Sequence, residues 1–186
     1  MKLNKIMVAM GLGFVMMAGA ANAAITDQGH GTVTIKGSII DAPCSITPET
    51  QDQTVELGQI SNKQLENQGK SLPQAFNIKL ENCDLAKDKN TVEITFSGMP
   101  SAGNPELIGM TGSAEGASIG LTNGSGELVK LGQKTPVTIT NGSNTLSFSA
   151  FLQGDAGTKD GDGNSVPAKI VPGSFQSVVD FNLVYP

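Results

Sequence analysis

The chain has 186 residues, with 12 lysines, 17 acidic residues and no arginine, so its formal net charge is −5 at pH 7. Affinity for nucleic acid comes mainly from Lys and Arg side chains that neutralise phosphates, so this composition argues against a nucleic-acid partner. The high glycine content, the absence of tryptophan, and short runs rich in Val, Ile, Thr and Phe favour a single all-β domain.

The N-terminus has the pattern of a secretory signal peptide. Lys2 and Lys5 precede an apolar run over residues 6–20, and the triplet Ala21-Asn22-Ala23 supplies a small-residue cleavage site. The run is too short to span a bilayer, and a core helix of the mature fold is the alternative that this order of features disfavours. We therefore predict that residues 1–23 are removed on export.

Period-two alternation marks the first predicted strand, over residues 29–39. Gly29, Gly31, Val33 and Ile35 share one side, and His30 lies on the other, more polar side. Turn residues separate the strands predicted further along the chain, and residues 63–68 predict a short helical turn. These strands cover residues 54–57, 75–80, 91–97, 117–122, 127–131, 136–139 and 145–152. Short strands at this spacing favour a β-sandwich over a parallel α/β sheet.

The last predicted strand, over residues 175–185, ends almost at the C-terminus. Its apolar row consists of Phe175, Ser177, Val179, Phe181, Leu183 and Tyr185. A domain that ends inside a half-buried strand has no residues left to cover the strand edge beyond it. The polar segment 154–165 before it is predicted to be an exposed loop.

The two cysteines, Cys44 and Cys83, predict one disulfide, since export would take the chain to an oxidising compartment. Two free buried thiols are the alternative. Closing this loop should contribute roughly 4 kcal/mol of stability through the unfolded chain. Without a C-x-x-C pair the bridge is predicted to be structural, with no redox role.

Little in the sequence suggests catalysis or a cofactor. His30 is the only histidine, which excludes any multi-histidine zinc site. Its place on the polar side of the first predicted strand favours a solvated side chain over the base of a Ser-His-Asp triad. Asp160, Asp162 and Asn164 follow the rhythm of a calcium loop, but Ser165 and Val171 replace the Gly and Glu that an EF-hand requires. We predict no catalytic residue, metal or cofactor; a hydrated acidic loop over residues 155–164 is favoured, with weak calcium binding as the alternative.

The first strand combines an apolar row with missing side chains. Glycine weakens a strand unless another backbone must approach closely, so Gly29 and Gly31 before Val33 and Ile35 suit insertion into a groove of another molecule. The residues alone leave open the alternative of an ordinary first strand, paired within its own domain.

Five segments along nearly all of the mature chain carry a resemblance to a known family. They are Gly31-Thr-Val-Thr-Ile-Lys-Gly37, Asp41-Ala-Pro-Cys-Ser-Ile46, Asp52-Gln-Thr-Val-Glu-Leu-Gly-Gln59, Asn77-Ile-Lys-Leu-Glu-Asn-Cys-Asp84 and Phe181-Asn-Leu-Val-Tyr185. In this order they resemble the pilin subunits of chaperone–usher fimbriae of Gram-negative bacteria, particularly major rod subunits of P-type and type 1 pili. Gly173, fourteenth from the C-terminus, and the penultimate Tyr185 also fit the family's C-terminal motif.

The resemblance implies an incomplete immunoglobulin-like sandwich that lacks its final strand and is completed by donor-strand exchange. In such a protein a periplasmic chaperone fills the groove during export, and the extension of the next subunit replaces it at the outer-membrane usher. By this match residues 24–36 are the donor strand, with Gly29, Gly31, Val33 and Ile35 facing the groove, and residues 37–186 are the pilin domain. The acceptor strand would use Gly173, Phe175, Val179, Phe181, Leu183 and Tyr185.

The expected function is a structural subunit that polymerises with copies of itself and sibling pilins into a cell-surface fibre used in adhesion. The alternatives are a minor pilin, as adaptor or terminator, a receptor-binding adhesin, and a periplasmic β-sandwich enzyme. The sequence departs from the family pattern at two positions. Asp27 falls in register with the inward row, so the deepest end of the groove would be left to Ile25, and Pro186 follows Tyr185.

Overall fold

The computed structural model describes residues 29–159, 161 and 165–186. The chain divides into two units, Met1–Ile39 and Ile40–Pro186, which are considered separately. The predicted signal peptide at residues 1–23 lies outside the described residues and stays a prediction, as do the structures of Asp160, Asp162 and Asn164.

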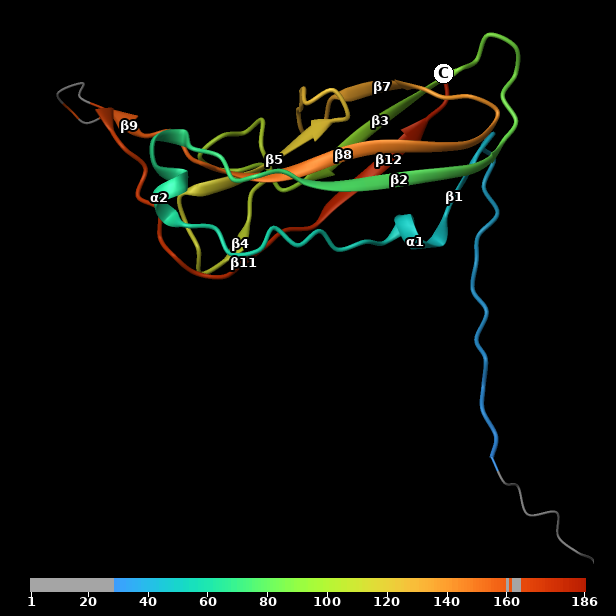
Figure 1. The fold of residues 1–186 in the computed structure, drawn as a ribbon, viewed down its shortest axis with the longest axis horizontal. Helices are drawn as coiled ribbons and strands as arrows, with labels where there is room; N and C mark the ends of the chain where they lie inside the picture. The colour runs from blue at the N-terminus through green and yellow to red at the C-terminus, as the bar shows by residue number, and fades with distance from the viewer. Residues whose placement is uncertain (1–28, 160, 162–164) are drawn as a thin grey trace, which may run out of the picture. The chain divides into compact units, whose positions relative to one another are not determined.

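In the first unit, the described residues 29–39 form neither a helix nor a strand (Figure 1, blue). The strand predicted there from alternation is therefore not formed in this structure. Val33 is 85% exposed, Ile35 91% and Ile39 103%. Alternation supplies an apolar row, but a strand also needs a partner for its backbone hydrogen bonds and a surface for that row to cover.

The second unit begins with β1 (Ser45–Ile46), two short helices, α1 (Pro48–Gln51) and α2 (Asn62–Leu65), and a 3-10 turn at Glu66–Gln68. The helical turn predicted at residues 63–68 is thus confirmed. The remaining strands are β2 (Gln74–Cys83), β3 (Thr91–Gly98), β4 (Thr111–Gly112), β5 (Ala117–Asn123), β6 (Leu128–Val129), β7 (Lys134–Thr138), β8 (Gly142–Gly154), β9 (Thr158–Lys159), β10 (Ser165–Val166), β11 (Phe175–Gln176) and β12 (Val179–Val184). No helix in the described part of the chain is long and apolar enough to cross a membrane.

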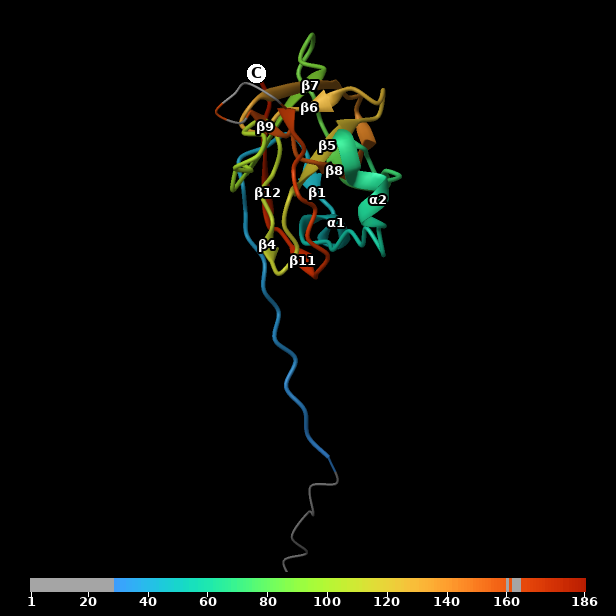
Figure 2. The same cartoon turned by 90° about the vertical axis from the view of Figure 1, so that its left-hand side faces the viewer.

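Two antiparallel sheets form the body of this unit (Figures 1 and 2). The larger has the strand order β1-β2-β8-β5-β6 and the smaller has the order β12-β3-β7. Short pairs join β11 to β4 and β10 to β9. The strand order and the antiparallel pairing confirm the prediction of an all-β sandwich.

Aromatic side chains from both sheets meet in the core. Phe96 of β3 packs edge-on against Phe148 of β8, with ring centroids 5.0 Å apart and planes at 78°. Phe76 of β2 and Phe181 of β12 extend this cluster, with centroids 6.3 and 6.4 Å from that of Phe96. Such edge-to-face contacts add to the stabilisation that burial of the rings provides.

The predicted strands at residues 75–80, 91–97, 117–122, 136–139 and 145–152 all form, most of them longer than predicted. The strand predicted at residues 127–131 is limited to β6, and the last one is divided into β11 and β12. The strand predicted at residues 54–57 does not form, although its alternation persists as half-buried Val55 and Leu57 between exposed neighbours. This prediction was wrong because no neighbouring strand of the described chain pairs with that stretch.

Candidate functional site

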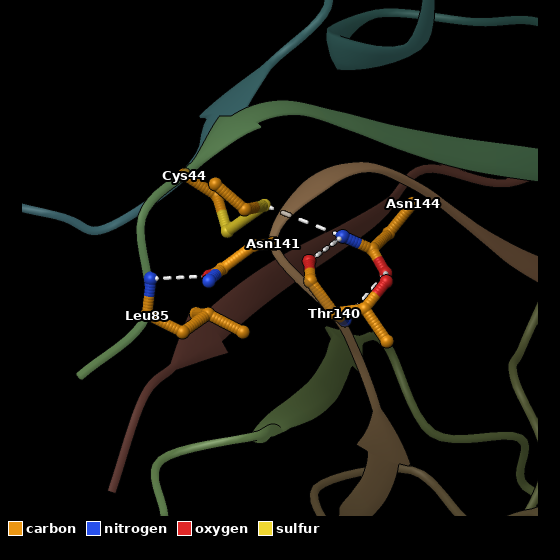
Figure 3. The surroundings of a disulfide bond; sticks show 6 residues. Cys44, Leu85, Thr140, Asn141 and Asn144 are labelled. Carbon is orange, nitrogen blue, oxygen red and sulfur yellow. Dashed lines mark hydrogen bonds between the residues drawn. A yellow bond between two sulfur atoms is a disulfide. The ribbon is translucent and has the colours of Figure 1, made fainter. Parts of the chain in front are cut away.

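A disulfide joins Cys44, beside β1, to Cys83, at the end of β2 (Figure 3), which confirms the predicted bridge. Both cysteines are almost fully buried. Nearby, the backbone N–H of Leu85 donates to Asn141 Oδ1 over 2.8 Å, and Asn144 Nδ2 donates to the carbonyl of Thr140 over 2.7 Å. The bridge therefore fastens β1 to the sheet beside the turn that precedes β8.

A β-bulge is what points Cys83 inward. Leu80 lies opposite Asn144 and Cys83 opposite Gly142, so β2 contains one more residue than β8 across this interval. Ile78 and Leu80 face the core, and in a regular strand Cys83, three residues after Leu80, would point outward because strand side chains alternate. The bulge places Cys83 on the inner face instead. Asn82, in the bulge, has φ 53°, a left-handed conformation that asparagine tolerates well.

The row predicted on the last strand is present. Its members, Phe175, Ser177, Val179, Phe181, Leu183 and Tyr185, are all half-buried, and the residues between them are exposed. The apolar members pack against the core. We call this set the C-terminal row. Burial raises the pKa of the Tyr185 phenol above its ordinary value.

The C-terminal row is bent between β11 and β12. β11 pairs with β4, whereas β12 pairs with β3 from Val179 opposite Gly98 to Val184 opposite Glu93. At the bend the Ser177 hydroxyl donates to the carbonyl of Gly109 over 2.7 Å. The sequence pattern did not reveal this change of partner, because the in–out alternation continues through it.

Gly173, which the resemblance assigned to the acceptor strand, lies just before β11. A Cβ atom there would be 2.5 Å from Ser113 Oγ and 2.6 Å from the backbone nitrogen of Ala114. The absence of a side chain thus allows the segment before β11 to approach the residues after β4. The site needs glycine for this close approach, and no left-handed φ is involved.

A second set of half-buried apolar residues, Val55, Leu57 and Ile60, lies between α1 and α2 and also packs against the core. We call it the opposite row. Its stretch is drawn as a plain tube in Figure 1. A pocket of about 400 Å³ joins one end of the two rows; its lining includes Ile60, Leu65, Met110, Ile170 and Phe175. We call it the end pocket.

The four edge strands of the two sheets differ in how much unpaired backbone they expose. β1 and β6, at the ends of the larger sheet, have two residues each. β7 has five residues, of which Pro136 has no backbone N–H. β12 has six residues and no proline, and no strand in the described chain pairs with its free side. It is therefore the longest unprotected edge of the sandwich.

The structure offers little for other chemistry. Among the described residues there is no group of three or more His, Cys, Asp or Glu side chains that could hold a metal ion. Asp155, at the start of the predicted acidic loop, accepts a hydrogen bond from the buried Ser118 hydroxyl, which lies 2.6 Å from Ser101 Oγ. This polar contact, which sequence reasoning missed, joins three segments of chain and gives no sign of a ligand.

The predicted donor residues Gly29, Gly31, Val33 and Ile35 are in the first unit, and all are exposed. The predicted acceptor residues from Gly173 to Tyr185 are in the second unit, along one free sheet edge and the end pocket. Sequence reasoning included no residue of the opposite row among the site residues, although the alternation at residues 54–57 was a signal that these side chains face the core.

Comparison with known proteins gives consistent matches. Residues 33–176 match the family model described as fimbrial protein. The chain is 54% identical over 186 residues to the Fimbria A protein of Serratia marcescens, covering 100% of this chain and 99% of that protein. It is 44% identical over 187 residues to the major MR/P fimbria protein of Proteus mirabilis (strain HI4320), with the same coverage.

Solved structures agree. A subunit of a chaperone–usher pilus matches with a TM-score of 0.71 and 31% identity over 86% of this chain and 97% of that chain. The P pilus rod subunit PapA matches with a TM-score of 0.65 and 30% identity, over 78% of this chain and 100% of that chain. The sandwich is therefore of the immunoglobulin-like type found in these subunits.

Proposed function

Because this chain belongs to the fimbrial protein family, we propose that it is a structural subunit whose exposed N-terminal segment completes the sandwich of the next copy in a surface fibre. Membership makes it a self-associating pilin of the fimbriae that Gram-negative bacteria display. The observation that carries the donor-strand mechanism is the pairing of complementary features: an unpaired, apolar strand edge at β12 and an exposed, alternating segment at residues 29–39.

Each feature supplies what the other lacks. The inserted segment would gain a partner for its backbone groups along β12, which is how strand addition provides affinity. Its side chains Val33 and Ile35 would cover the C-terminal and opposite rows. Full burial of each such side chain contributes about 1.5–3 kcal/mol, so a few of them with a run of backbone hydrogen bonds make a durable junction.

We propose a donor row that extends beyond the predicted limit at residue 36. The alternation continues through Gly37 to Ile39, and the second unit begins only at Ile40. Ile39 is the last apolar side chain of the row. The end pocket is lined by apolar residues that include Ile60, Leu65, Met110 and Phe175, so the branched side chain of Ile39 would fill it better than the preceding member of the row, Gly37. We therefore place Ile39 in the end pocket of the next copy, with residues 29–39 antiparallel to β12.

The route to the surface is part of the same proposal. Residues 1–23 would direct export and be removed, and a periplasmic chaperone would cover β12 until the donor segment replaces it at an outer-membrane usher. An unprotected apolar edge is an aggregation hazard, which is why such a cap is needed. No catalytic step is assigned, since assembly requires only the exchange of one strand for another.

The test is size analysis and thermal unfolding of the mature protein, refolded with its disulfide, with and without a peptide of residues 24–39. The peptide should convert self-associating protein into a monomer with a raised melting temperature; a ligand at 1,000 times its Kd adds about 4 kcal/mol. A peptide with Val33→Asn and Ile35→Asn should fail, whereas one with Thr32→Asn and Thr34→Asn should bind. A stable monomer indifferent to every peptide would show that the fold is already complete.

A further inference from the structure

Charge is distributed unevenly between the two units. Of the chain's 17 acidic residues, none lies between residues 29 and 39, where Lys36 is the only lysine. Lys36 falls on the outward side of the alternation, between Ile35 and Gly37. An inserted donor segment would therefore bring one outward-facing cation to a subunit that is strongly acidic.

Each wall of the acceptor carries one matching anion. Asp180 is the only acidic side chain between Phe175 and Tyr185, and Glu56 is the only one between residues 53 and 60. Both side chains are exposed and alternate with half-buried members of their rows. Among the described residues, neither Asp180 nor Glu56 belongs to an ion pair, whereas Glu66, Glu106 and Glu93 each pair with a lysine.

The two anions lie at similar distances from the end pocket. Ile60 and Phe175 both line that pocket. Glu56 comes four residues before Ile60, and Asp180 comes five residues after Phe175. At about 3.3 Å per residue, each carboxylate is on the order of 15 Å along its wall from the pocket.

Lys36 comes three residues before Ile39, so with Ile39 in the pocket its Cα lies about 10 Å along the same direction. The long lysine side chain covers the remaining distance, as diagonal pairs on neighbouring strands do. We infer that Lys36 of one copy is held between Glu56 and Asp180 of the next copy, and that this contact fixes the register and orientation of the inserted strand. This inference rests on the proposed strand exchange.

The Lys36 contact affects which partner and which register are selected more than it affects the stability of the junction. An exposed ion pair is weak, whereas charge complementarity steers encounter and disfavours a partner or a register that places like charges together. A slip by one residue would also turn the apolar row outward, so Lys36 discriminates mainly among slips by two residues, which keep the row inward.

The experiment follows assembly of the full mature chain by light scattering at low salt. Lys36→Glu should slow fibre growth about fivefold to tenfold, because it replaces attraction with repulsion from two carboxylates. The triple variant Lys36→Glu, Glu56→Lys, Asp180→Lys should recover the wild-type rate. Lys87→Glu, an exposed lysine outside both rows, is the matched control and should leave the rate unchanged.

A mixing experiment sharpens the test. Wild-type and triple-variant chains carrying different dyes should form separate fibres at low salt, and should mix as salt shortens the range of the interaction. Unaltered growth of the Lys36→Glu chain, or random mixing at low salt, would overturn the inference and leave strand exchange intact. Wild-type protein that neither polymerises nor accepts the peptide of residues 24–39 would instead overturn the proposed function.

Discussion

Gly120 of β5 lies opposite Phe151 of β8 on the outer face of the larger sheet, away from the main core. Phe151 is nonetheless only 4% exposed, and Lys70 Nζ lies 5.0 Å from its ring centroid. A Cβ atom at position 120 would be 2.2 Å from the Phe151 Cζ atom. The glycine thus makes room for an aromatic ring where an outward-facing side chain would otherwise be exposed.

Gly120→Ala should destabilise the protein by about 1–3 kcal/mol, since overpacking forces the ring and its neighbours to move. Gly124→Ala is the matched control: a Cβ atom there meets nothing closer than 3.5 Å, so a change within about 0.5 kcal/mol is expected. Urea unfolding followed by circular dichroism measures both. Equal midpoints for the two variants would contradict the close contact.

We predict that ionisation of Tyr185 destabilises the folded protein at alkaline pH. Burial raises the pKa of its phenol, so the folded chain holds the proton more tightly than the unfolded chain, whose phenol titrates near 10. The stability that this difference contributes is complete below about pH 10 and is lost as the pH rises through the folded-state pKa.

Because Tyr185 is the only tyrosine, the absorbance of the phenolate reports on this residue alone. Its midpoint should lie above that of the urea-unfolded chain. Between pH 9 and 12 the wild-type melting temperature should fall more steeply than that of Tyr185→Phe, which has no proton to lose. Coincident midpoints in the folded and unfolded protein would remove the argument.

At the scale of the element, the β2 bulge is needed to form the disulfide. Asn82→Val keeps the residue count, but a β-branched side chain disfavours the left-handed conformation that the bulge requires, so it should destabilise the protein by about 1–2 kcal/mol. Asn82→Gly is the matched control, because glycine adopts this conformation without strain, and it should stay close to the wild type. Urea unfolding measures both variants, and equal midpoints would contradict the role of the bulge.

Elements with a partner inside the chain were predictable from sequence, because in them the alternation reflects burial against the protein's own core. β3 and β8 are examples, since Val92 to Phe96 and Leu146 to Ala150 alternate with more exposed residues. The alternating stretches at residues 29–39 and 54–57 failed as strands for one physical reason. Their patterns match an apolar surface, but the hydrogen-bonding partner that makes a strand is missing from the described chain.

Some features had no readable pattern. β4 and β11 have two residues each, and their first residues, Thr111 and Phe175, are 64 positions apart in the sequence. Strands this short produce no periodic pattern from which their pairing could be predicted. The bulge at Asn82 depends on the count of residues in β8 as much as on β2 itself. The apolar members of the C-terminal row, by contrast, were fully predictable, since the alternation fixes which side chains share a face.

At the scale of the whole molecule, the two edges of the smaller sheet have opposite properties. β7 carries Lys134 and Pro136, two residues that discourage pairing with another strand, and Lys134 also bonds Glu93 of β3 over 2.6 Å. β12 carries neither lysine nor proline. A subunit built this way should add strands along one edge only, so the fibre grows without branching.

Pro136→Val should therefore create a second adhesive edge, because it restores a backbone N–H within β7. With β12 saturated by the peptide of residues 24–39, wild-type protein should stay monomeric, and the variant should show several-fold higher light scattering. Thr138→Val adds similar apolar area on the same strand without restoring an N–H, so it should resemble the wild type. If both variants associate equally, added apolar surface is the cause; if neither does, β7 is protected by something other than its proline.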